Sequence, residues 1–171
     1  MEQSGSRSEI RTGASTNVLT KGVFKLWFDH GIAPEDDSYA YILTPGKVTV
    51  AEMESYDQGN IKILENSNDV QAVKHEALDM IQMVFYTAKT AVFDGIKVGV
   101  DKPSALILKN VSTSEIEVFI ADPGENNPEI QVVLETENIP FRKITVEMPM
   151  ENAYKGSTVN FTINTETPKT P

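Results

Sequence analysis

The stretch that decides the fold is Glu115-Ile116-Glu117-Val118-Phe119-Ile120, which runs into the turn Asp122-Pro123-Gly124. Its three aliphatic residues stand at every second position, and a β-strand directs alternate side chains to opposite faces of a sheet. The strand must then end, because proline has no backbone N–H to donate and glycine favours a turn. The stretch therefore predicts one short strand with a core on one of its faces.

The same pattern recurs on both sides of this strand. Further short strands are expected at 96–100, 105–108, 130–134, 144–148 and 159–163. Short alternating strands at a regular spacing, separated by turn residues, are typical of a small antiparallel β-sandwich. We expect this sandwich over residues 95–165, followed by a polar tail, 166–171, that frays.

The preceding half of the chain is also rich in strand patterns. Strands are expected at 22–28, 39–44, 61–64, 70–75 and 78–86, with one short helix at 48–56. The strand at 78–86 carries apolar residues on both faces, so it should be central and covered above and below. Residues 21–94 hardly supply those covering layers, which suggests that the chain is part of something larger. Residues 1–20 form a polar, partly ordered start.

Composition excludes several classes of function. The 171 residues contain no cysteine, so disulfides, Cys-ligated zinc and thiol catalysis are ruled out. The formal net charge is −10 and the basic residues are scattered, which argues against nucleic acid, anionic lipid and polyanionic polysaccharide as partners. No apolar run is long enough to span a bilayer, and Met1–Thr20 does not read as a signal peptide.

The two histidines, His30 and His75, are the residues most able to act as a general base or metal ligand. Each has a carboxylate beside it in sequence, Asp29 or Glu76. Neighbours in a strand point to opposite faces, however, so neither carboxylate is placed to orient its histidine. A structural role is favoured for both, and we predict no catalytic residue, no cofactor and no metal site.

Two other groups of residues suggest binding. Glu35, Asp36 and Asp37 crowd one loop, but the ligand spacing of a calcium loop is absent and a solvated acidic loop is favoured. Trp27, Tyr39 and Tyr41 could form a platform on which sugar rings stack. Because Trp27 lies in an expected core strand, packing is favoured, and these three residues remain weak candidates for substrate binding.

A set of motifs in order along the chain resembles a known family. It comprises Leu26-Trp27-Phe28-Asp29-His30-Gly31, Ser38-Tyr39-Ala40-Tyr41-Ile42-Leu43-Thr44-Pro45-Gly46, Val70–His75, Val98–Pro103 and Ile120-Ala121-Asp122-Pro123. Together they resemble polysaccharide lyases of family 8, which act on chondroitin, hyaluronan or xanthan. Gly124 stands where the family usually has threonine.

The resemblance implies a fold and a role. Residues to about 93 would end the family's central antiparallel β-supersandwich, and those from about 96 would form its small C-terminal β-sandwich, so the fold is all-β. The family cleaves uronic-acid polysaccharide by β-elimination, with Tyr, His and Asn residues of an N-terminal α/α-toroid and the adjoining start of the central domain. No residue of this chain matches that catalytic motif.

The resemblance therefore implies a non-catalytic portion of a bacterial, secreted lyase, extracellular or periplasmic, whose partners are the α/α-toroid and the polysaccharide. Two alternatives stay open. One is a stand-alone carbohydrate-binding module that uses Trp27 or the tyrosines, and the other is an Ig-like adhesion module that binds protein.

Overall fold

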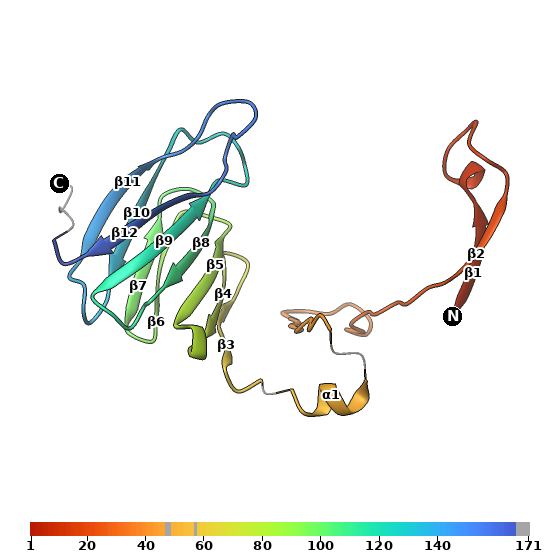
Figure 1. Ribbon diagram of the computed structural model, residues 1–171, viewed down its shortest axis with the longest axis horizontal. Coiled ribbons are helices and arrows are strands. Elements are labelled where there is room, and N and C mark those ends of the chain that lie inside the picture. The colour runs from red at the N-terminus through yellow and green to blue at the C-terminus, as the bar shows by residue number, and fades with distance from the viewer. Residues whose placement is uncertain (47–48, 57, 167–171) are drawn as a thin grey trace. The chain divides into compact units, whose positions relative to one another are not determined.

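The computed structural model describes residues 1–46, 49–56 and 58–166, which form two compact units divided after Pro45 (Figure 1). Each unit is considered by itself below. Among the described residues, no helix has the length and apolar character needed to cross a bilayer.

The second unit is a sandwich of two antiparallel sheets of unequal width. The larger sheet has six strands in the order β12-β9-β8-β5-β4-β3. Their bounds are β3 Ile61–Asn66, β4 Val70–His75, β5 Met80–Phe85, β8 Ser104–Lys109, β9 Glu115–Ala121 and β12 Val159–Asn164. The smaller sheet has four strands in the order β11-β10-β7-β6. Their bounds are β6 Lys89–Phe93, β7 Ile96–Val100, β10 Glu129–Glu135 and β11 Arg142–Glu147.

The core lies between these two sheets. In β9, Ile116, Val118 and Ile120 are fully buried, as the alternation of that stretch predicts. The matching positions of β8, β10 and β12 are buried too, including Leu106, Leu108, Ile130, Leu134 and Ile163. Every strand expected between residues 96 and 164 is present, and the all-β fold is confirmed.

The hairpin β6–β7 was not expected, because the apolar pattern breaks between Thr87 and Gly95. Asp94 and Gly95 form its two-residue loop, with φ angles of 47° and 80°. Positive φ at both positions is the geometry of the tight turn that best matches the twist of paired strands. Buried Ala91 and Phe93 supply the inward face of β6.

Ion pairs join the two sheets on the side of the sandwich where their edge strands β3 and β6 lie. The Lys89 ammonium group in β6 lies 3.1 Å from Glu65 of β3 and 3.5 Å from Asp69. Lys74 of β4 lies 3.5 Å from Asp94 in the β6–β7 turn. These contacts connect the edge of the smaller sheet to the edge of the larger one at two points.

The strand expected at 78–86 is only partly as predicted. β5 is central, since it pairs with β4 and β8, and Ile81, Met83 and Phe85 are buried. Its other face carries exposed Gln82 and half-buried Val84, and the described residues leave that face open to solvent. The prediction that β5 is covered on both faces therefore holds for one face only.

The predicted division at residues 94 and 95 is not where the structure divides. Those residues form the β6–β7 turn, and β5 pairs with β8 across the same point of the chain. Strands from both predicted halves thus share one sheet and one core. Strands β3, β4 and β5 are hydrogen-bonded into the same sheet as the later strands β8, β9 and β12.

The first unit contains less sheet than predicted. Its strands are β1, Glu2–Ser6, and β2, Val18–Gly22, which form a polar hairpin with the 3₁₀ turn η1, Arg7–Glu9. The expected strands at 22–28 and 39–44 are not strands in the structure. Strand propensity measures how well a side chain fits a paired, half-buried surface, so it produces no strand where no partner strand lies alongside.

The short helix expected at 48–56 is confirmed as α1, Val50–Glu54; residue 48 lies outside the described residues, as do 167–171 of the predicted frayed tail. A capping box starts α1. The Thr49 hydroxyl accepts a hydrogen bond from the Glu52 N–H at 3.3 Å, and the Glu52 carboxylate accepts one from the Thr49 N–H at 3.0 Å. A further 3₁₀ turn, η2, covers Glu76–Leu78.

Asp122 organises the loop that follows β9. Its side chain is buried and accepts hydrogen bonds from the backbone N–H groups of Gly124, Asn126 and Asn127, at 3.0, 3.0 and 2.8 Å. Burial raises the pKa of Asp122, but these N–H donors, with the Asn127 amide, outweigh it and hold the pKa below its usual range. The carboxylate thus supplies the hydrogen-bond acceptors that a neighbouring strand would otherwise offer to these backbone N–H groups.

We expect D122N to lower the free energy of unfolding by about 2–3 kcal/mol at neutral pH, because the amide NH₂ cannot accept from the N–H groups that the carboxylate satisfies. The folded-state pKa lies below the unfolded value of about 3.9, so this stabilisation is present above that pH and is lost as the pH falls through the folded value. Urea unfolding from pH 7 to pH 2 measures both effects. D101N is the matched control, since exposed Asp101 accepts one backbone bond, from Gln131. A D122N deficit that stays constant down to pH 2 would contradict this account.

Gly156 faces the same loop with a φ of +69°, and a Cβ there would overlap the carbonyl oxygen of Asp122. Gly95 has a similar φ of +80° but open space around it. We expect G95A to cost about 1 kcal/mol, the strain of the left-handed conformation alone, and G156A to cost distinctly more. Thermal unfolding of the two variants side by side measures the difference, and equal losses would show that the Asp122 contact is unimportant.

Candidate functional site

Aromatic side chains gather in the first unit, between Phe28 and Tyr41. The ring of Phe28 stacks on that of Tyr39, with centroids 4.8 Å apart and planes 24° apart, and Tyr41 lies 6.1 Å from Phe28. His30 stands 6.2 Å from Tyr39 and 6.5 Å from Phe28. The segments expected to be two strands thus approach each other through their side chains.

A contact with a carboxylate positions the histidine in this cluster. Nδ1 of His30 lies 2.5 Å from a carboxylate oxygen of Asp37, with the His30 side chain 28% exposed. Asp29, the carboxylate next to His30 in sequence, instead accepts a hydrogen bond from the Gly31 N–H at 2.9 Å. The partner of His30 comes from across the loop, a relation that adjacency in sequence does not reveal.

The three sequence-predicted sugar-contact residues are all exposed in the first unit: Trp27 by 73%, Tyr39 by 59% and Tyr41 by 66%. The structure brings Tyr39 and Tyr41 together around the ring of Phe28. Trp27 is not among the rings in contact with them. Exposed aromatic rings with polar edges can stack against sugars, although nothing about this cluster encloses a ligand.

The cluster combines a histidine, a carboxylate and two tyrosines. Among the described residues, no arginine takes part in the contacts of His30 with Asp37, Phe28 and Tyr39. His75 lies far along the chain, at the end of β4, and its Nδ1 atom is buried without a hydrogen-bond partner among the described residues. The described residues also contain no group of three or more His, Cys, Asp or Glu side chains arranged to hold a metal ion.

Perturbed carboxylates occur elsewhere, in structural positions. The pKa of Glu65 is lowered mainly by a hydrogen bond from the Ser67 hydroxyl, at 2.6 Å, with Lys89 adding to the effect. The pKa of Glu76 is lowered by Lys62 and then by Lys74. Perturbed groups often mark active sites, but these belong to the ion pairs at the sandwich edge.

The His30–Asp37 contact makes a spectroscopic prediction. A carboxylate at Nδ1 selects the tautomer that carries its proton on that nitrogen. We expect D37N to shift the neutral ring of His30 toward the Nε2-protonated tautomer, as read from long-range ¹H–¹⁵N correlation spectra. D36N, at the neighbouring exposed residue, is the control and should leave the spectrum unchanged. Identical spectra for the two variants would rule out the contact in solution.

Two family models match the chain. Residues 1–57 match the super-sandwich domain of polysaccharide lyase family 8, and residues 62–131 match the C-terminal β-sandwich domain of the same family. The change from one model to the other thus falls between residues 57 and 62 and not near residue 94.

Curated relatives support the same family. The chain is 34% identical over 160 residues to the chondroitinase-AC of Pedobacter heparinus, covering 92% of this chain and 22% of the relative. It is 29% identical over 118 residues to a xanthan lyase of Bacillus sp., covering 68% of this chain and 12% of the relative. The chain therefore spans about a fifth or less of the length of these relatives.

Solved structures agree. A chondroitinase AC lyase known from enzyme–oligosaccharide complexes superposes with a TM-score of 0.76 at 31% identity, covering 94% of this chain and 24% of that one. The chondroitin AC lyase of Streptomyces coelicolor A3, at 17% identity and a TM-score of 0.70 over 96% of this chain and 23% of its own, shares the fold. The chain belongs to polysaccharide lyase family 8, with sequence of the family's super-sandwich domain and of its C-terminal β-sandwich domain.

Proposed function

We propose that this chain is a non-catalytic β-sandwich portion of a polysaccharide lyase that cleaves uronic-acid-containing polysaccharide by β-elimination. In this role it supports a catalytic α/α-toroid that lies elsewhere in the lyase. The family membership and the chondroitinase relatives support the substrate class. The relatives are named for polymeric polysaccharides, which are too large to enter a cell intact, and this supports an extracellular or periplasmic location.

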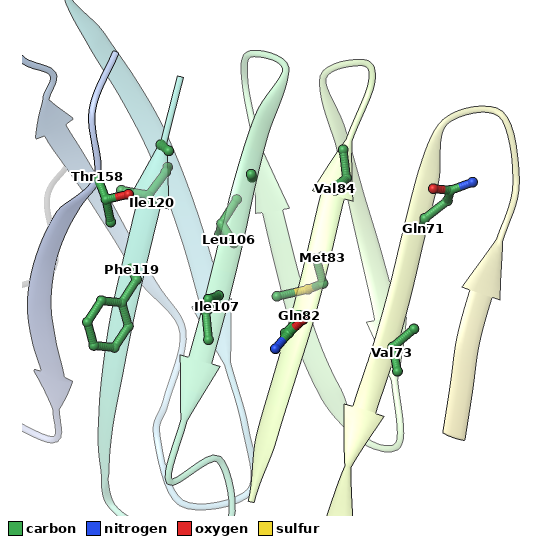
Figure 2. A pocket seen from close by; sticks show the side chains of 12 residues that line it. Gln71, Val73, Gln82, Met83, Val84, Leu106, Ile107, Phe119, Ile120 and Thr158 are labelled. Carbon is green, nitrogen blue, oxygen red and sulfur yellow. The ribbon is translucent and has the colours of Figure 1, made fainter. Parts of the chain in front are cut away.

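The observation that carries the proposal is the chemistry of the described surface. Abstraction of a proton next to a uronate needs a base together with groups that stabilise negative charge. The His30 cluster offers a base without an arginine among its contacts. An open hollow on the outer face of the six-stranded sheet is lined by apolar side chains, two glutamines and Thr158, none of them charged (Figure 2). A net charge of −10 also opposes a polyanionic substrate.

We expect the purified chain to produce no unsaturated uronate from chondroitin sulfate or hyaluronan, measured by the ultraviolet absorbance of that product. The paired experiment replaces the aligned segment of the Pedobacter heparinus chondroitinase-AC with this chain. The resulting chimaera should fold and degrade chondroitin sulfate, because the scaffold is kept. Turnover by the isolated chain, or an inactive chimaera, would contradict the proposal.

The exposed ring cluster favours a second candidate function, a carbohydrate-binding module. Calorimetric titration of the chain with chondroitin sulfate, hyaluronan and a neutral glycan distinguishes the two. A scaffold should release no heat. A binding module should release heat that Y41A abolishes, while Y154A, at an exposed tyrosine outside the cluster, leaves it unchanged.

A further inference from the structure

The loop between β6 and β7 carries a dipeptide that can rearrange chemically. Asp94-Gly95 is the single Asp-Gly pair in the sequence, and no asparagine is followed by glycine. An aspartate cyclises when the backbone nitrogen of the next residue attacks the carbon of its carboxyl group. Glycine presents that nitrogen without a Cβ beside it, so this pair is the least hindered of its kind in the chain.

The structure leaves this pair accessible. The Asp94 side chain is 49% exposed, and a Cβ built on Gly95 would meet no atom within 4 Å apart from its chain neighbours. The register pairs Phe93 with Ile96, so the Gly95 N–H lies in the loop, outside the ladder that joins β6 and β7. The turn therefore offers both room for a ring and access for water.

Aspartates in other loops of the sandwich are held differently. Asp122 is buried, and the next residue, Pro123, has no N–H hydrogen to lose when its nitrogen forms a new bond. The Asp79 carboxylate accepts hydrogen bonds from the Ser112 N–H and hydroxyl, at 3.0 and 2.7 Å, and Met80 after it begins strand β5. Sequence and packing together single out Asp94.

An ion pair restrains the reaction at this site. Nζ of Lys74 in β4 lies 3.5 Å from a carboxylate oxygen of Asp94, and the Lys74 side chain is 15% exposed. The carboxylate must leave Lys74 before its carbon can meet the Gly95 nitrogen. The peptide link between Asp94 and Gly95 must also rotate out of the turn, in which both residues have positive φ. The reaction thus starts from a locally opened form of the hairpin.

We propose that Asp94 is a site of spontaneous isomerisation whose rate is set by the Lys74–Asp94 ion pair. The Gly95 nitrogen forms a bond to Cγ of the neutral Asp94 carboxyl group, while its proton and the carboxyl hydroxyl leave as water. Water then opens the five-membered imide at either carbonyl carbon. One opening restores aspartate, and the other gives isoaspartate, in which the chain runs through Cβ and Cγ. Water is the only co-reactant.

The product changes the contact between the two sheets. Isoaspartate lengthens the backbone of a two-residue loop by one carbon atom and carries its free carboxylate directly on Cα. The tight turn depends on its two-residue length, and the contact with Lys74 depends on the present reach of the Asp94 side chain. Isomerisation therefore removes one of the ion pairs that connect edge strand β6 and its turn to the larger sheet.

Ageing of the whole chain in H₂¹⁸O at neutral pH, followed by trypsin digestion in ordinary water, tests the proposal. Trypsin releases the peptide 90–97, which contains no second aspartate and no asparagine. We expect a separately eluting form of this peptide that is heavier by one ¹⁸O atom and resists cleavage by a protease specific for the bond before aspartate. D94E keeps a carboxylate but does not form the five-membered ring, so its peptide should show neither change.

Two further variants test the role of the ion pair. We expect K74Q to accumulate isoaspartate about two- to fivefold faster than the unaltered chain, the factor that loss of a surface ion pair produces. E76Q is the matched control, because it removes the other ion pair of Lys74, at 3.1 Å, and keeps the one with Asp94. It should age at the unaltered rate.

Absence of ¹⁸O from the peptide 90–97 in both the unaltered chain and K74Q would overturn the proposal. It would also be overturned if K74Q aged no faster than the unaltered chain, or if E76Q accelerated the reaction as much as K74Q. In the last case the rate would follow the general stability of the sheet edge and not the contact between Lys74 and Asp94.

Discussion

The sandwich depends on the burial of the apolar side chains that stand at alternate positions of its strands. Each fully buried Ile, Leu, Val or Phe contributes about 1.5–3 kcal/mol, and one sheet can bury them only against another. The larger sheet has six strands and the smaller has four, so the two layers cannot match edge for edge. Lys89 and Lys74 reach across where β3 and β6 meet and anchor the narrower layer to the wider one.

The same constraint explains the contrast between the two units. In the second unit every strand has a hydrogen-bonded neighbour in one of the two sheets. In the first unit the segments around Phe28 and Tyr41 carry strand-forming residues but pair with no strand in the described part of the chain. Their side chains contact one another through the rings of Phe28, His30 and Tyr39 instead. Large exposed side chains such as Phe24 and Ile32 remain beside them.

Residue patterns predicted the later strands well because Ile116, Val118 and Ile120 alternate without interruption and end at a proline turn. They missed β6, where the inward residues are Ala91 and Phe93, since one small residue breaks a visible alternation. The Asp94-Gly95 pair is nevertheless a sequence that favours a two-residue β-hairpin turn. For the candidate site, residue patterns suggested Tyr39 and Tyr41, which stay a prediction. They did not reveal the contact of His30 with Asp37, because a loop contact depends on a backbone path that no periodicity encodes.

The position of β12 in the larger sheet has a consequence for biosynthesis. β12 pairs only with β9, and β10 and β11 of the other sheet intervene along the chain. As the polypeptide emerges from the ribosome, the edge of β9 therefore stays unpaired until the last strand of the sandwich has been translated. That strand carries Ile116, Val118 and Ile120 on its inner face, and an unpaired apolar strand edge exposes N–H and C=O groups to which another chain can pair.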